Sequence, residues 1–140
     1  MRTSPRRRAR EFVLQGLYQR QLSGNACAAI REQVAAAAGF PKADEAYFDV
    51  LWAGVTAEYD ALVELAAPKL DRRAAELSPI ERGILVIGAW ELAHRPEIPC
   101  RVVINEAIEL AKLYGGTDGH KFVNGVLDKL ATTLRAAEMD

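Results

Sequence analysis

The segment from Ser78 to His94 constrains the fold most, because it predicts a helix that is apolar on nearly every side. Ser78 can accept hydrogen bonds from the first free amides of this helix, Pro79 occupies its first position, and Glu81 can complete a capping box. The apolar residues that follow are Ile80, Ile84, Leu85, Val86, Ile87, Ala89, Trp90 and Leu92. Such a helix belongs at the centre of a helical bundle, where Glu91 is expected to be a hydrogen-bonded or ion-paired carboxylate at the edge of the core.

Helices are also predicted before and after this segment, and no stretch alternates apolar and polar residues as a strand would. Ser4 and Pro5 supply the N-cap and the first residue of a helix that continues to about Leu22. The other helical segments predicted from apolar spacing and from Gly or Pro at their ends cover residues 26–38, 44–67, 70–75, 100–114 and 118–136. The expected fold class is therefore all-α, with about seven helices forming two small packed bundles.

The domain organisation follows from the connection between Pro68 and Pro79, which divides the chain into helical halves of about residues 1–67 and 77–140. A chain of 140 residues has the usual length of one domain, so we expect the halves to form a single domain. The longest uncharged apolar run, Gly83–Trp90, is far shorter than the ~20 residues that a membrane helix needs. We expect a cytoplasmic protein without a membrane-spanning helix.

Positive charge is concentrated at the start of the chain. The first ten residues contain five arginines and no acid, whereas the whole chain has 18 basic and 19 acidic residues. These arginines are Arg2, Arg6, Arg7, Arg8 and Arg10, and the last four lie on the first predicted helix as a dense basic face. A localised basic patch is typical of a polyanion-binding site, so nucleic acid is the first partner to consider. The alternative is a solvated helix end without a ligand.

No group of residues in the sequence predicts catalysis, a metal site or a cofactor. Cys27 and Cys100 belong to no ligand-spaced cluster and are expected to be reduced, part-buried thiols. The Gly-rich segment 115–121 lacks the spacing of a phosphate-binding loop and follows a helix rather than a strand. We expect there a helix that ends at glycine and a next helix capped by Asp118 or Thr117. With no candidate nucleophile, base or metal cluster, the chain is not expected to be an enzyme.

Phe122 is unusual because it stands about 100° away from the apolar stripe of the last helix. Single-stranded RNA is often bound by an aromatic ring beside a cation and an amide, here Lys121 and Asn124. The ring stacks on a base, the cation meets a phosphate, and the amide contacts a base edge. The alternative is that Phe122 packs on the adjacent bundle. On the first helix, Leu14 and Tyr18 lie opposite the core stripe, on a side that faces either the same fold or a partner.

Several segments of the chain resemble the NusB family. The first are residues 6–11 with 14–18 and residues 77–82 with 90–92, and the most specific are INEAIELAK at 104–112 and KFVNGVLDK at 121–129. The resemblance extends from end to end, with a weak match over residues 26–42. It implies an all-helical protein of two packed bundles. Val86 and Trp90 differ from the residues that are usual in the family. Both differences are expected to lie in the protein interior.

This resemblance implies a transcription antitermination factor without catalytic activity. Members of the family pair with ribosomal small-subunit protein ten, also called NusE. The heterodimer binds the single-stranded boxA element of nascent ribosomal or phage RNA and joins an RNA polymerase elongation complex. The RNA contacts that the resemblance implies are Arg6, Arg7, Arg10, Lys121, Phe122 and Asn124. The protein-partner contacts that it implies, near the same edge, are Tyr18, Leu22, Glu81 and Asp118.

Two other functions remain open at this point. NusB-like domains also occur in front of RNA cytosine methyltransferases, although this sequence contains neither the cofactor-binding α/β domain nor the catalytic cysteine motif of such an enzyme. Alternatively, Leu14, Tyr18 and Leu22 form an apolar face of a helical interaction module that has no RNA role. A homodimer would cover this same surface.

Overall fold

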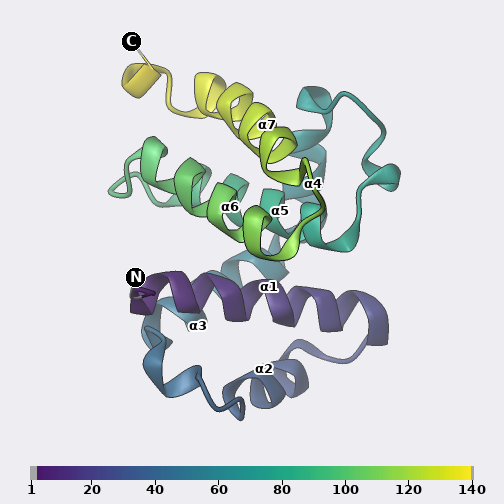
Figure 1. The fold of residues 1–140 in the computed structure, drawn as a ribbon, viewed down its shortest axis with the longest axis vertical. Coiled ribbons are helices and arrows are strands. Elements are labelled where there is room, and N and C mark those ends of the chain that lie inside the picture. Colours follow the sequence, from purple (N-terminus) through teal and green to yellow (C-terminus); the bar gives the residue numbers. More distant parts are fainter. Residues whose placement is uncertain (1–2, 140) are drawn as a thin grey trace. The chain divides into compact units, whose positions relative to one another are not determined.

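The all-α architecture is confirmed by the computed structural model, which describes residues 3–139 and contains no strand among them (Figure 1). The α-helices are α1 (Pro5–Ser23), α2 (Cys27–Ala35), α3 (Glu45–Ala57), α4 (Tyr59–Ala66), α5 (Pro79–His94), α6 (Cys100–Tyr114) and α7 (Gly119–Leu134). Short 3-10 turns cover Phe40–Lys42, Ala67–Lys69, Ala74–Glu76 and Ala136–Met139. Arg2, a member of the predicted basic cluster, lies outside the described residues.

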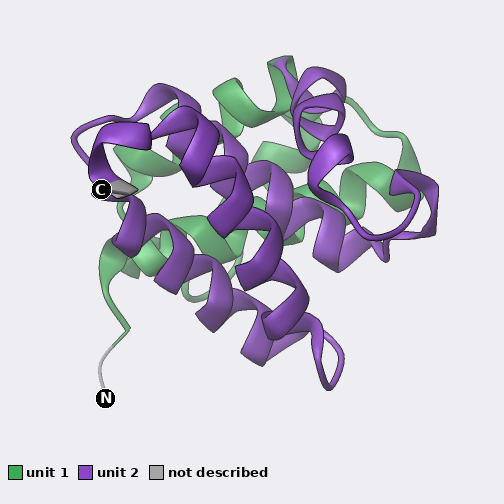
Figure 2. Cartoon of the chain, turned by 90° about the horizontal axis from the view of Figure 1, so that it is seen from above, with its two compact units in different colours: residues 1–57 green, residues 58–140 purple. Residues whose placement is uncertain are grey.

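The chain divides into two compact units, residues 1–57 and residues 58–140 (Figure 2). The first unit contains α1, α2 and α3, and the second contains α4 to α7. This division lies between α3 and α4, ahead of the connection between Pro68 and Pro79 at which the sequence placed it.

The single helix predicted over residues 44–67 is wrong. Glu58 leaves the helical region at φ −114° and ψ 16°, so α3 ends at Ala57 and α4 begins at Tyr59. No glycine or proline marks this break. Its cause is tertiary, because α3 packs on α1 in the first unit whereas α4 packs on α5 in the second.

An aromatic cluster fills the core of the first unit. The ring centroids of Phe12 and Phe40 are 5.3 Å apart, those of Phe40 and Phe48 5.2 Å, and those of Phe48 and Trp52 6.2 Å. At Gly16, α1 approaches α3 so closely that a Cβ atom would lie 2.7 Å from the Trp52 ring. The position therefore requires glycine, and this contact helps to hold the long α1 helix against α3.

The second unit is built around α5, whose predicted N-cap Ser78 is confirmed. The amide of Glu81 donates to Ser78 Oγ at 3.1 Å, and the Ser78 hydroxyl donates to Glu81 Oε1 at 3.2 Å. Both residues that differ from the usual family pattern, Val86 and Trp90, are buried, as expected of interior variation. Glu91 is also buried, and α4, α6 and α7 all pack against α5.

The guanidinium of Arg135 ties the end of α5 to the segment that leads into α6. It donates to the carbonyl oxygens of Leu92 at 2.8 Å and Ile98 at 3.0 Å. It also pairs with Glu138, and the second carboxylate oxygen of Glu138 accepts from the amide of Cys100 at 2.7 Å. The Cys100 amide and the Arg135 guanidinium lower the pKa of Glu138 below its ordinary value. This set of hydrogen bonds fixes the residue at which α6 begins.

The described residues also settle the state of the two cysteines and the predictions about membrane helices and metal ligands. Cys27 and Cys100 are free thiols, the first half-buried and the second buried, as predicted. Among residues 3–139, no helix combines the length and apolar character needed to cross a membrane. Within the same range, no three His, Cys, Asp or Glu side chains come together as metal ligands.

Candidate nucleic-acid interface

The basic end of α1 is anchored before any ligand binds. Ser4 Oγ accepts from the amide of Arg7 at 3.0 Å, and the carbonyl of Pro5 accepts from the amide of Asp44 at 2.9 Å. Arg6 lies with its guanidinium carbon 4.1 Å from the centroid of the Tyr47 ring and one nitrogen 3.9 Å from Asp44 Oδ2. The first turn of α1 is thus connected to the first turn of α3 by backbone and side-chain contacts.

Arg10 departs from the sequence prediction. The exposed basic face was expected to include Arg6, Arg7, Arg8 and Arg10, but Arg10 is only 3% exposed. Its guanidinium carbon lies 5.6 Å from the centroid of the same Tyr47 ring that Arg6 covers. Arg10 follows Arg6 by one helical turn, so both side chains point toward α3. The accessible part of this face consists of Arg6, Arg7 and Arg8, each half-buried.

The apolar face predicted on α1 is also smaller than expected. Tyr18 and Leu22 are 40% and 66% exposed, and they lie one turn apart near the end of the helix. Leu14 is 2% exposed and belongs to the core, which agrees with the alternative that this side faces the same fold and removes Leu14 from the apolar face of the interaction-module alternative. Sequence periodicity could not distinguish burial from exposure on this side of α1. Residues outside its main apolar stripe are buried too, so the position of a residue around the helix does not decide its exposure.

In the second unit, the ring of Phe122 at the start of α7 is covered by a residue that the sequence did not single out. The guanidinium carbon of Arg72 lies 4.1 Å from the Phe122 ring centroid. Arg72 Nε also donates to Asp71 Oδ1 at 2.8 Å, which lowers the pKa of Asp71 and raises that of Arg72. A guanidinium plane on an aromatic ring offers a base a stacking surface and a phosphate a positive charge.

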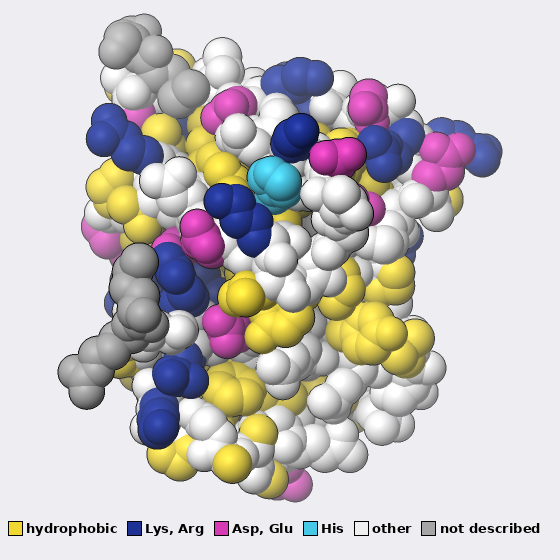
Figure 3. All heavy atoms as spheres, viewed as in Figure 1, with side chains coloured by type: hydrophobic (Ala, Val, Ile, Leu, Met, Phe, Trp, Pro, Cys, Tyr) yellow, Lys and Arg dark blue, Asp and Glu magenta, His cyan; other side chains and the backbone are white. Residues whose placement is uncertain are grey.

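The predicted partner contacts Glu81 and Asp118 lie close to this group rather than apart from it. A Cβ atom on Gly119, the residue after Asp118, would lie 3.6 Å from Glu81 Oε2. Asp118 is the N-cap residue of α7, one of the two predicted, but its side chain makes no capping hydrogen bond, and Lys121 Nζ lies 3.6 Å from Asp118 Oδ1 instead. Lys121 is 73% exposed. In the upper part of Figure 3, basic and acidic side chains accordingly alternate over the surface.

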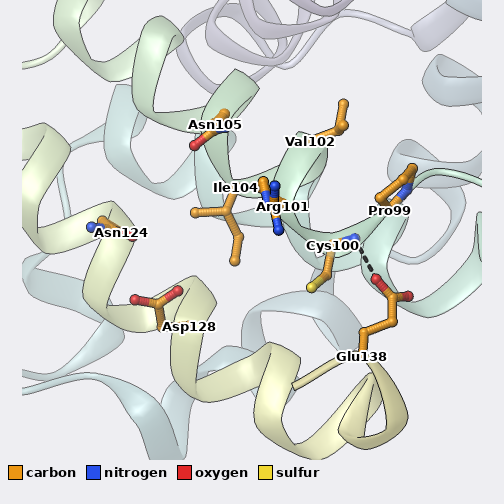
Figure 4. A pocket seen from close by; sticks show the side chains of 9 residues that line it. All are labelled: Pro99, Cys100, Arg101, Val102, Ile104, Asn105, Asn124, Asp128 and Glu138. Carbon is orange, nitrogen blue, oxygen red and sulfur yellow. Dashed lines mark hydrogen bonds between the residues drawn. The ribbon is translucent and has the colours of Figure 1, made fainter. Parts of the chain in front are cut away.

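Asn124 stands apart from Phe122, although both residues are on α7. At about 100° per residue, the two side chains leave the helix about 160° apart. Phe122 faces Arg72, whereas Asn124 lines a hollow between α6 and α7 (Figure 4). The stacking predicted for Phe122 and the base-edge contact predicted for Asn124 would therefore involve different nucleotides.

Comparison with known proteins identifies the family. A family model described as the NusB family matches residues 7–132. The chain belongs to the NusB family. A transcription antitermination protein NusB of Nitrosomonas europaea is 57% identical over 134 residues, which cover 96% of this chain and 80% of that protein. The corresponding protein of Thiobacillus denitrificans is 55% identical over 135 residues, which cover 96% of this chain and 93% of that protein. NusB proteins are transcription antitermination factors and not enzymes, which confirms that prediction.

Solved structures also have the NusB fold. The T. maritima NusB structure is 29% identical, covers 94% of this chain and 93% of its own, and aligns with a TM-score of 0.81. A chain in the crystal structure of a plectonemic RNA supercoil aligns with a TM-score of 0.83, covering 96% of this chain and 99% of its own. At 20% identity, the latter shows a shared fold only.

Two residues of the interface lie outside the segments that indicated the NusB family. Arg72 is in the connection between α4 and α5, and Tyr47 is in α3. Neither has a local motif, so the sequence could not pair Arg72 with Phe122 or Tyr47 with Arg6. The only available signal for Arg72 was the charged run Asp71-Arg72-Arg73 next to a helix start.

Proposed function

We propose that this chain is a cytoplasmic transcription antitermination factor that binds boxA-type single-stranded RNA together with ribosomal small-subunit protein ten (NusE), without catalysing a reaction. Through the RNA and NusE it joins an RNA polymerase elongation complex. Membership of the NusB family supports the antitermination role. The observation that carries the RNA-binding part is the Phe122 ring with the Arg72 guanidinium at 4.1 Å, beside the exposed Lys121.

Some of the proposed RNA contacts stack on bases, and the others bind phosphates through their charge. Phe122 and Arg72 provide a planar surface for a base, and Lys121 provides a cation for a phosphate. On α1, Arg6 and Arg7 contact the RNA backbone, since they lie in the accessible part of the basic face. Arg10 supports Arg6 through Tyr47 and does not itself reach RNA, because it is buried.

For NusE, we propose contacts in each unit. Tyr18 and Leu22 offer an exposed apolar pair on α1, which is the kind of surface that a protein partner covers. Glu81 and Asp118 offer carboxylates at the start of α5 and α7. A second copy of this chain is the alternative occupant of the apolar pair, since the same exposed side chains suit a homodimer.

The RNA-binding proposal is tested by Phe122→Leu, which keeps the side chain apolar but removes the ring. Base–aromatic stacking contributes about 1–3 kcal/mol, so affinity for a boxA-like RNA should fall about 5- to 150-fold. The measurement is fluorescence anisotropy with a boxA-like RNA and a scrambled RNA of equal length, each with and without NusE. Val50→Ala, which shortens an exposed apolar residue of α3, is the matched control and should bind RNA as the unmodified chain does. Equal binding of both RNAs by the unmodified chain, or unchanged affinity of Phe122→Leu, would contradict the proposal.

The partner surface is tested by Leu22→Lys, which places a charge on the exposed apolar pair. Light scattering should show that NusE no longer forms a heterodimer with the variant, while RNA binding without NusE is unchanged. If the unmodified chain is instead a dimer that NusE does not split, and Leu22→Lys makes it monomeric, the second copy is the occupant.

A further inference from the structure

A hollow of about 560 Å³ lies between the start of α6, the middle of α7 and the segment after α7 (Figure 4). Its volume falls in the range of small-molecule sites and exceeds what one nucleobase needs. Ile104 and Cys100 give it an apolar part. Arg101 and Asn105 of α6 and Asn124 and Asp128 of α7 give it polar walls on two sides.

The fold does not use these four polar side chains. Within residues 3–139, none of Arg101, Asn105, Asn124 and Asp128 has a side-chain hydrogen bond or an ion pair with another residue. Glu138, which also lines the hollow, differs because the Cys100 amide and Arg135 occupy its carboxylate. The hollow therefore presents donors and acceptors that are available to a ligand, held on two helices whose positions are fixed.

The chemistry of this set suits a base edge better than a phosphate. An amide side chain carries a donor and an acceptor side by side, which complements the edge of an unstacked base. The Asp128 carboxylate repels phosphate but accepts from an exocyclic amino group, as acidic side chains do with cytosine. Among the described residues that line the hollow, Arg101 is the only cation, and it can neutralise the phosphate next to an inserted base.

We propose that this hollow binds one unstacked, amino-bearing nucleobase of the RNA, with Asn105, Asn124 and Asp128 contacting its edge and Arg101 its phosphate. The inference rests on the proposed RNA-binding function and adds a second base-binding position to it. That position is distinct from Phe122, because the Phe122 and Asn124 side chains leave α7 about 160° apart.

A single strand can connect the two positions over the outer face of α7. Lys121 lies between Phe122 and Asn124 around the helix and is largely exposed. Gly125, one turn after Lys121, is exposed, and a Cβ atom there would meet nothing within 4 Å. A helix with its side chains is about 10–12 Å across, so the two bound bases are not adjacent in the RNA.

The test combines RNAs that each lack one base with a variant of the hollow. A boxA-like RNA is prepared with an abasic nucleotide at each position in turn, and its binding is measured by fluorescence anisotropy. The unmodified chain should lose affinity about tenfold or more at two non-adjacent positions. Asn105→Ala/Asn124→Ala should lose affinity for the intact RNA by a similar factor and become insensitive to the abasic nucleotide at one of those positions only. Phe122→Leu should become insensitive at the other.

The controls separate failure of this inference from failure of the proposed function. Both variants alter exposed or half-buried side chains, and an unchanged thermal unfolding midpoint confirms that the fold is intact. Asp128→Asn, which keeps the shape of the side chain, should reduce the preference for an amino-bearing base at the same position. If the double variant keeps the abasic profile of the unmodified chain, the hollow binds no base, although RNA binding itself stands. If it binds RNA normally but loses the gain from NusE, the hollow binds protein, and the inference is overturned.

Discussion

The basic end of α1 and the outer face of α7 both carry predicted RNA contacts, but the fold uses their charged groups to different extents. On α1, Arg6 and Arg10 lie against the Tyr47 ring, and Arg10 is buried. On α7 and the neighbouring α6, Lys121 is largely exposed, and the side chains of Asn124, Arg101 and Asn105 have no hydrogen bond within residues 3–139. The density of arginines in a sequence thus does not measure the charge that is available to a ligand.

This comparison predicts that a charged side chain that is buried or paired within the fold contributes to stability. An exposed charged side chain should instead contribute to RNA binding. The largest effect is expected at Arg135, which lies in the same unit as α7 and is almost wholly buried. Arg135→Met leaves the carbonyls of Leu92 and Ile98 and the Glu138 carboxylate without their donor. The free energy of unfolding should fall by about 3 kcal/mol or more, measured by urea denaturation.

Arg101→Met is the matched control, because Arg101 is exposed and has no partner within residues 3–139. It should change the free energy of unfolding by less than about 0.5 kcal/mol. Similar stability losses in the two variants would show that burial of the guanidinium does not distinguish them, and the comparison would fail within the second unit.

The features that sequence could predict are those decided by neighbouring residues. Ser4 and Ser78 cap the helices that begin at the next residue, each by accepting from the amide three residues ahead, and Gly24 ends α1 with φ 71°. The apolar pattern of α5 likewise predicted a helix at the centre of a bundle, and most residues of α5 are buried as expected. Local hydrogen bonds and periodicity therefore gave most of the helix ends. The number of α-helices agrees only because two errors cancel: the helix predicted over residues 70–75 is only a 3-10 turn at Ala74–Glu76, and the one predicted over residues 44–67 is two helices.

The features that sequence could not predict depend on contacts between distant segments. The break at Glu58 follows from α3 and α4 packing on different helices, and no local residue marks it. Arg10 is buried because Tyr47 is supplied by another helix, and Phe122 is covered because Arg72 comes from a loop. Residue types and motifs in the sequence identified the candidate site. Which of its side chains are accessible to a ligand could be determined only from the structure.

The second prediction concerns Arg10, whose substitution tests directly whether a buried arginine of α1 acts in stability rather than in RNA binding. Arg10→Met keeps much of the side-chain stem but removes the guanidinium near the Tyr47 ring. A desolvated cation–π contact contributes up to about 2 kcal/mol, so the free energy of unfolding should fall by about 1–2 kcal/mol. Thermal or urea denaturation measures this, with Lys121→Met on α7 as the matched change of a charged residue.

For Lys121→Met we expect a change in unfolding free energy within about 0.5 kcal/mol, because the side chain is exposed and its pair with Asp118 is long. If Arg10→Met is as stable as the unmodified chain yet binds RNA more weakly, Arg10 reaches RNA directly. The burial of Arg10 would then not prevent it from binding RNA, and the charged residues of α1 and α7 would both act in RNA binding.

The smallest effect is expected from Lys121 in the salt dependence of RNA binding. Each phosphate neutralised on a single strand contributes about −0.7 to the slope of log affinity against log salt concentration. Lys121→Gln should therefore make the slope shallower by about 0.7, with little change in affinity at high salt. Anisotropy titrations at several salt concentrations measure this, and Lys42→Gln, which removes an exposed cation in the first unit outside the proposed contacts, should leave the slope unchanged. A slope that is unchanged in Lys121→Gln would mean that Asp118 already neutralises this cation at 3.6 Å. The open face of α7 would then bind RNA through its uncharged groups, and the contrast with α1 would be one of hydrogen bonding rather than of charge.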